Sequence, residues 1–231
     1  MANKGFSAAE DYFGTIAGLK KKTSNDGKTS SVAECPDEYG DTAVHDVYGE
    51  TFAPSVEYVV EDEITDATPL ISLGDIKTVT LGGAEKKIMV TSVAISTGAN
   101  NPPSVTISGV EVESGATAKR TYPVKINLKP RSKAQDVAGA FVASAKFTQL
   151  NTTFSVDPHV QTVSGTPVVS DASHGKAEVA ATMTDGDGTG TITASTSGGF
   201  TITAAAAKSA PDAGYIQLTA TATKFLTGTE A

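Results

Sequence analysis

TYPVKINLKPRSKAQDVAGAFVASAKF, residues 121–147, holds the most regular hydrophobic patterns in this chain. In its first part apolar residues occupy every second position, which is the period of a strand with one buried and one exposed face. These four residues are Tyr122, Val124, Ile126 and Leu128. Pro130 follows them, and because proline cannot donate to a hydrogen-bond ladder, we predict a strand over residues 121–129 that ends there.

The second part of the stretch changes to helical spacing. Ser132 stands three residues before Gln135, as in a capping box, and apolar residues then recur every three or four positions. The sequence therefore predicts one α-helix over residues 132–147, flanking a sheet. The residues of its apolar stripe that we expect in the core are Val137, Phe141 and Val142.

The composition favours strands and turns over helices. Among 231 residues there are 32 Thr and 22 Gly, whereas Trp is absent and Cys35 is the only cysteine. A single cysteine permits no internal disulfide, which fits assembly in a reducing compartment. The N-terminus lacks the apolar core of a signal peptide, and no apolar run is long enough to cross a membrane. We therefore expect a soluble protein made in the cytoplasm, with no membrane partner.

Charge is distributed very unevenly along the chain. Residues 29–76 carry twelve acidic side chains and no Lys or Arg, whereas residues 77–133 carry nine basic and three acidic ones. The net charge of −8 argues against general nucleic-acid binding, which needs clustered basic residues. One interpretation of the acidic run is a solvated face. The other is a subunit whose acidic and basic surfaces meet on neighbouring copies.

The chain divides into three parts by pattern. Residues 1–28 are expected to form an N-terminal arm or short helix, with a disordered terminus as the alternative. Residues 29–76 predict an acidic, loop-rich segment packed on the main domain. Residues 77–231 predict that domain, a mainly β, antiparallel β-sandwich or partly closed barrel with the flanking helix at 132–147.

Several further strands are expected in the main domain. The patterns place strands at residues 86–96, 104–114, 149–156, 166–169, 177–183, 189–196, 200–205 and 215–223. The last two should form a hairpin through the turn at residues 211–214. In strand 104–114 the parity of the apolar residues slips near Ser108 and Gly109, which predicts a β-bulge there.

Motifs for catalysis or metal binding are weak. Residues 185–188, DGDG, resemble the start of a calcium loop, but a hairpin turn explains them better. His45, His159 and His174 stand at no metal-ligand spacing in the sequence. Glu61, Asp62 and Glu63 could supply a glycosidase carboxylate pair, yet no aromatic platform surrounds them. We predict no enzyme activity, no cofactor and no metal site.

The order of strands and helix over residues 86–147, the segment 175–183 and the closing strand from Tyr215 resemble a virion structural protein of a tailed bacteriophage, most closely the tail tube (major tail) proteins. That resemblance implies a β-sandwich or barrel with a flanking helix. It also implies a homo-oligomer of stacked rings lining a channel through which DNA passes without specific binding. The acidic segment is longer than a simple ring-to-ring loop requires, which leaves a capsid decoration or head-tail adaptor (neck) protein open. A surface carbohydrate-binding β-module is a further alternative.

For a tube subunit, the charge pattern suggests two sets of residues. Carboxylates lining the channel would repel the phosphates of passing DNA. The channel-facing candidates are Glu34, Asp37, Glu38, Asp41, Asp46 and Glu50. Other charged residues would pair between adjacent subunits. The inter-subunit candidates are Glu61, Asp62 and Glu63 on one copy and Lys129, Arg131 and Lys133 on the next. Other virion proteins would be its partners, and the virion, assembled in the host cytoplasm, its location.

Overall fold

The computed structural model describes residues 12–36, 42–81, 84–113, 116–130, 133–142, 146–163, 166–185, 192–210 and 215–230. The described chain is mainly β, with antiparallel pairing throughout and no closed barrel. The strands are β1 (Leu19–Asn25), β2 (Lys28–Pro36), β3 (Thr42–Phe52), β4 (Ser55–Val60), β5 (Ile71–Leu73), β6 (Ile76–Leu81), β7 (Ala84–Gly98), β8 (Ser104–Val112), β9 (Arg120–Val124), β10 (Phe147–Val163), β11 (Thr166–Asp185), β12 (Thr201–Ala210), β13 (Tyr215–Phe225) and β14 (Thr229–Glu230).

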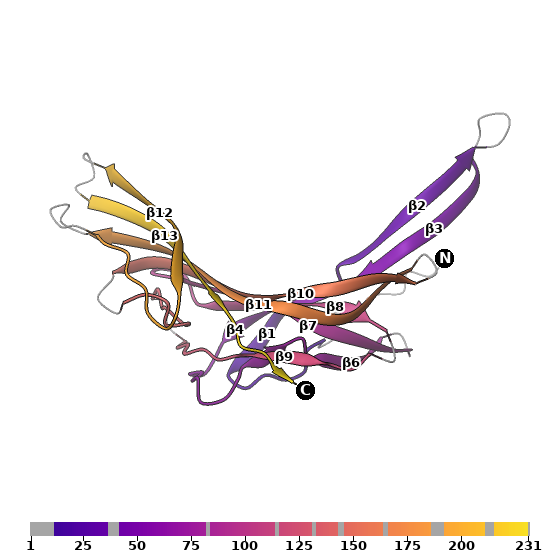
Figure 1. The fold of residues 1–231 in the computed structure, drawn as a ribbon, viewed down its shortest axis with the longest axis horizontal. Coiled ribbons are helices and arrows are strands. Elements are labelled where there is room, and N and C mark those ends of the chain that lie inside the picture. Colours follow the sequence, from indigo (N-terminus) through magenta and orange to yellow (C-terminus); the bar gives the residue numbers. More distant parts are fainter. Residues whose placement is uncertain are drawn as a thin grey trace.

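One large sheet forms the body of the molecule (Figure 1). Its strands follow the order β1-β4-β8-β7-β10-β11-β13-β12, and β6 pairs with β7 off this path. The predicted strand 86–96 is confirmed as the central β7. Along one edge β7 pairs with β8, while its other edge is shared by β6 and then β10.

A small three-stranded sheet, β14-β9-β5, forms a second layer beneath the large one. The core lies between the two layers, and the predicted alternation over residues 121–129 is confirmed by burial. Tyr122, Val124, Ile126 and Leu128 are all at most 4% exposed. Only residues 120–124 form the named strand β9, and Leu128 continues the pairing through an isolated bridge to Ile64. The arrangement is sandwich-like, with an open main sheet.

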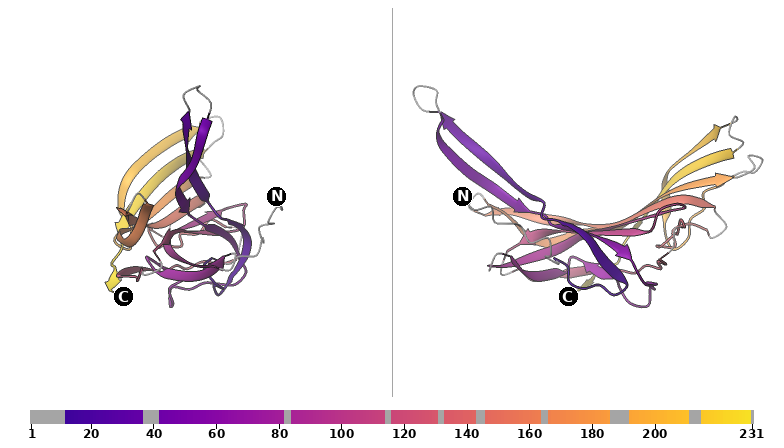
Figure 2. Two further views of the ribbon diagram at one scale, coloured as in Figure 1. Left: turned by 90° about the vertical axis from the view of Figure 1, so that its right-hand side faces the viewer. Right: turned by 180° about the vertical axis from the view of Figure 1, so that it is seen from behind.

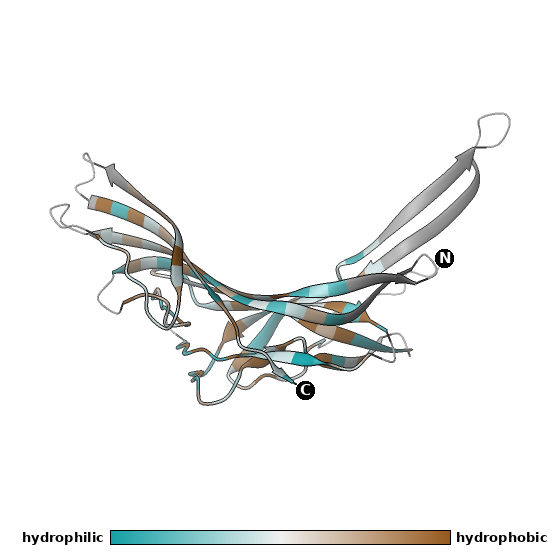
Figure 3. Cartoon of the chain, in the orientation of Figure 1, coloured by the Kyte–Doolittle hydropathy of each residue, from teal (hydrophilic) through white to brown (hydrophobic). Residues whose placement is uncertain are grey.

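Two arms rise from this body on the same side (Figure 2). One is the β2–β3 hairpin, which forms a two-stranded sheet of its own. The other is the outer part of β10, β11, β13 and β12, along which hydrophobic and hydrophilic residues are mixed (Figure 3). The predicted hairpin of residues 200–205 and 215–223 is confirmed there as β12 and β13.

The predicted helix over 132–147 does not form in its described residues, 133–142 and 146–147. The Asp136 carboxylate accepts hydrogen bonds from the backbone N–H groups of Ala140, at 3.1 Å, and Phe141, at 2.6 Å. Gly139 has a φ of +64°, in the left-handed region. A side chain that binds the N–H of its own i+4 residue competes with the helical bond to the carbonyl, so this segment closes as a turn. Val137 and Phe141 are buried as predicted, but Val142 is 43% exposed.

Three smaller expectations also change. The irregularity predicted at Ser108 and Gly109 is present, but the extra residue is Thr91 on the opposing strand β7. Residues 192–195 form no strand, although residues 189–196 were predicted to form one. No helix forms in the described part of the N-terminal segment, where residues 19–25 are strand β1; residues 1–11 lie outside the described chain.

Candidate assembly surface

The acidic trio, Glu61, Asp62 and Glu63, follows directly after β4, and all three residues are exposed. Glu61 forms an ion pair with Lys20 at 3.1 Å, and Glu63 forms one with Lys129 at 3.1 Å. Every side chain in these two pairs is more than half exposed, so each pair contributes at most about 1 kcal/mol. The structure therefore brings two of the predicted partners, Glu63 and Lys129, together within one chain.

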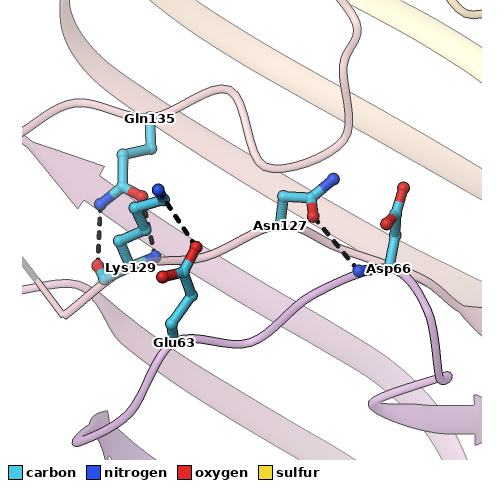
Figure 4. Close-up of polar contacts among 5 residues, drawn as sticks. All are labelled: Glu63, Asp66, Asn127, Lys129 and Gln135. Atoms are coloured by element: carbon cyan, nitrogen blue, oxygen red, sulfur yellow. Dashed lines mark hydrogen bonds and ion pairs between the residues drawn. The ribbon is translucent and has the colours of Figure 1, made fainter.

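Backbone contacts explain why Glu63 and Lys129 meet (Figure 4). Ile64 and Leu128 exchange backbone hydrogen bonds of 2.8 and 2.9 Å. The Gln135 side chain holds Lys129 from the other side, because its Oε1 accepts from the Lys129 N–H and its Nε2 donates to the Lys129 carbonyl, both at 2.9 Å. Gln135 is thus a clamp on Lys129 instead of part of a capping box.

The other inter-subunit candidates are placed differently. Asp62 lines a surface cavity of about 680 Å³ together with Glu63, Phe13 and Ile16. Lys133 is exposed and makes no ion pair with a described residue. Arg131 lies outside the described residues. Among the described members of this set, Asp62 and Lys133 are therefore the two that make no ion pair with another described residue.

The described channel-facing candidates belong to the β2–β3 arm. Glu34 lies in β2, opposite His45, while Asp46 and Glu50 lie in β3. Asp37, Glu38 and Asp41 fall outside the described residues. Residues 29–51 of this arm contain six acidic residues and no Lys or Arg, so the arm carries negative charge away from the body of the sheet.

The edge strand β12 was not singled out from the sequence. It pairs with β13 on one side, and no described strand pairs with its other edge. Side chains on both faces of its middle part are exposed, including Ala204, Ala205, Ala206 and Ala207. An edge segment that carries no charge over residues 201–207, and whose small side chains are exposed on both faces, is a template for pairing with another chain. The run of four alanines between Thr203 and Lys208, with no charged residue earlier in the strand, was the available sequence signal.

A second open edge lies at the opposite end of the sheet. Strand β10 pairs with β7 only over residues 149–155, so its edge over residues 157–163 has no partner among the described strands. By contrast, the edge strand β1 contains Lys20, Lys21 and Lys22 and an irregular register. Edge lysines and bulges are the usual protection of a sheet edge. Strand β12 has one lysine, Lys208, and one register shift, whereas the far part of β10 contains Asp157, Pro158 and two register shifts. Residues 204–207 of β12 are therefore the least protected edge of this sheet.

No described helix is of the length and apolarity that a membrane span requires. A search with protein-family models and a search of curated proteins both give no match to this chain.

Proposed function

We propose that this chain is a self-assembling structural subunit of a bacteriophage virion, most like a tail tube protein that forms stacked rings around a DNA channel. The observation that carries the self-assembly is the open edge of β12, which has no charged residue over residues 201–207. Main-chain hydrogen bonds along such an edge give affinity for an added strand without any binding pocket. A structural role needs no catalytic group, and the proposal assigns none.

The second open edge supports a head-to-tail contact between copies. Strand β12 and residues 157–163 of β10 are different surfaces of one sheet, so pairing them would be a heterologous contact. Contacts of this kind generate rings when the rotation closes and open filaments when it does not. Repetition around a ring would also remove both exposed edges from solvent.

The negative charge of the β2–β3 arm supports the proposal of a DNA channel. Its six acidic residues would repel phosphate if the arm faced the channel, so DNA would pass without sticking. The same arm also favours the second candidate, a capsid decoration or neck protein. An arm of this length suits insertion into another virion protein, and such a protein would not form tubes alone.

The test is electron microscopy and sedimentation of the purified chain with two matched variants. Ala204→Lys with Ala206→Lys places two charges on the β12 edge strand. Thr153→Lys places a charge at an exposed position of β10 that is flanked by β7 and β11. We expect rings or tubes from the wild type and from Thr153→Lys, and monomers from the edge variant. Monodisperse wild-type monomers at high concentration would contradict the tube and favour the decoration or neck role.

A further inference from the structure

Four polar side chains meet at a bulge in the β10–β11 pair. His159 Nε2 lies 2.7 Å from Ser173 Oγ, and His174 Nδ1 lies 2.8 Å from the same oxygen. Asp157 Oδ2 lies 3.6 Å from His174 Nδ1. All of these contacts are exposed to solvent, so a small solute can reach them. The two imidazoles are 15 positions apart in the sequence, and the antiparallel pairing brings them together.

The register places this group on one face. Asp157 pairs with Ser173, and His159 pairs with Asp171, so these four residues share a face of the two-stranded ribbon. Regular alternation would turn His174 to the other face. The register instead passes from Ser155 opposite Lys176 to Asp157 opposite Ser173, which leaves one extra residue on β11. Bulges of this kind re-aim a side chain.

The backbone of His174 is unusual in the same place. Its φ is +54°, and it is the one described non-glycine residue with a positive φ. Gly175 beside it is buried against the Tyr122 ring, where a Cβ would lie only 2.3 Å from the nearest ring carbon. The close packing of Gly175 on Tyr122 therefore stabilises the bulge. It also keeps the His174 backbone at a positive φ, although that conformation costs about 1 kcal/mol or more. The result is that His174 Nδ1 faces the same point as His159 Nε2.

We propose that His159, His174 and Asp157 bind a divalent transition-metal ion of the zinc class at the position now held by the Ser173 hydroxyl. Imidazole nitrogen is a preferred ligand of Zn²⁺, Ni²⁺ and Cu²⁺, and a carboxylate with water completes a tetrahedral set. Zinc–nitrogen distances are about 2.0–2.1 Å, so each nitrogen moves inward by roughly 0.7 Å while Ser173 rotates away. The described residues contain no group of three ligands already arranged around one point, so binding requires the side chains of His159, His174 and Asp157 to move together.

Calorimetric titration of Zn²⁺ into the full, tag-free chain tests the site. We expect the wild type to bind one ion per chain. The affinity for Zn²⁺ should fall about tenfold or more in His159→Gln and in His174→Asn. Asparagine is chosen at 174 because it tolerates a positive φ. His45→Gln and Asp171→Asn are the matched controls, since they remove the third histidine and a carboxylate on the same face; both should bind as the wild type does. Ser173→Ala should bind at least as well as the wild type, because the hydroxyl competes with the ion.

Nitrogen NMR of the wild type gives a readout that does not depend on folding of the variants. Zn²⁺ should shift the ring nitrogens of two of the three histidines. The proposal is overturned if the wild type takes up no zinc, if His159→Gln and His174→Asn bind like the wild type, or if Ser173→Ala loses binding. In those cases the group is a hydrogen-bonded support for the bulge.

Discussion

Phe141 is 4% exposed and its ring centroid lies 5.9 Å from that of Phe147, whereas the neighbouring Val142 is 43% exposed. Truncating Phe141 to Ala leaves a cavity in the core, so we expect a loss of about 3–5 kcal/mol in the free energy of unfolding. Val142→Ala removes exposed methyl groups and should change that free energy by about 0.5 kcal/mol or less. Urea denaturation measures both, and equal midpoints for the two variants would contradict this packing.

The burial of single side chains could be predicted from the sequence more reliably than the backbone conformation around them. The parity of Tyr122, Val124, Ile126 and Leu128 followed from strand geometry alone. The helix prediction used the same kind of reasoning and was wrong in the described residues, because Asp136 and Gln135 make specific side-chain bonds to backbone groups. Spacing rules use only the positions of apolar residues, so they do not take a hydrogen bond from a side chain to the backbone into account.

At the level of elements, the segment after β4 is bonded to residues 127–129 of its own chain. Changing Glu61, Asp62 and Glu63 to Lys replaces two attractive ion pairs by repulsive ones. Because these pairs are largely exposed, the monomer should stay folded and lose about 1–2 kcal/mol at most. If the trio also faces a second subunit, assembly measured by sedimentation should be lost.

The matched control for the trio is Glu85→Lys with Glu113→Lys, two exposed acids in other parts of the fold. We expect this control to assemble as the wild type does. Normal rings from the triple variant would remove the inter-subunit role and leave Glu61 and Glu63 as partners within one chain.

Pairing between distant strands was the part of the fold that the sequence did not disclose. Residues 149–156, 166–169 and 177–183 were predicted as three short strands, but they belong to two long ones, β10 and β11. These strands contain residues that break the hydrophobic pattern, yet His174 and Gly175 are accommodated in a bulge and Pro158 stays in register opposite Ala172, so neither strand ends there. The meeting of His159 and His174 depends on that register, so no spacing rule in the sequence could reveal it.

For the whole molecule, the uneven charge predicts a dependence of assembly on salt. Exposed charges more than about 8–10 Å apart are screened near physiological ionic strength, and strand pairing through backbone bonds is not. We expect the oligomer fraction in sedimentation to fall between roughly 0.05 M and 1 M salt. The Ala204→Lys with Ala206→Lys variant should stay monomeric at both concentrations. An unchanged wild-type fraction would show that charge complementarity does not join the subunits.

Strands β10 and β11 run from the β12–β13 arm through the body to the opposite end (Figure 1). A strand already rises about 3.3 Å per residue, and a fully extended chain reaches about 3.6 Å. Tension along this axis would therefore be carried by two covalent backbones that are already almost fully extended. The β10–β11 ladder has three register shifts, of which those near Ser155 and His159 lie in its interior. Under load the molecule should bend at these two points before it lengthens.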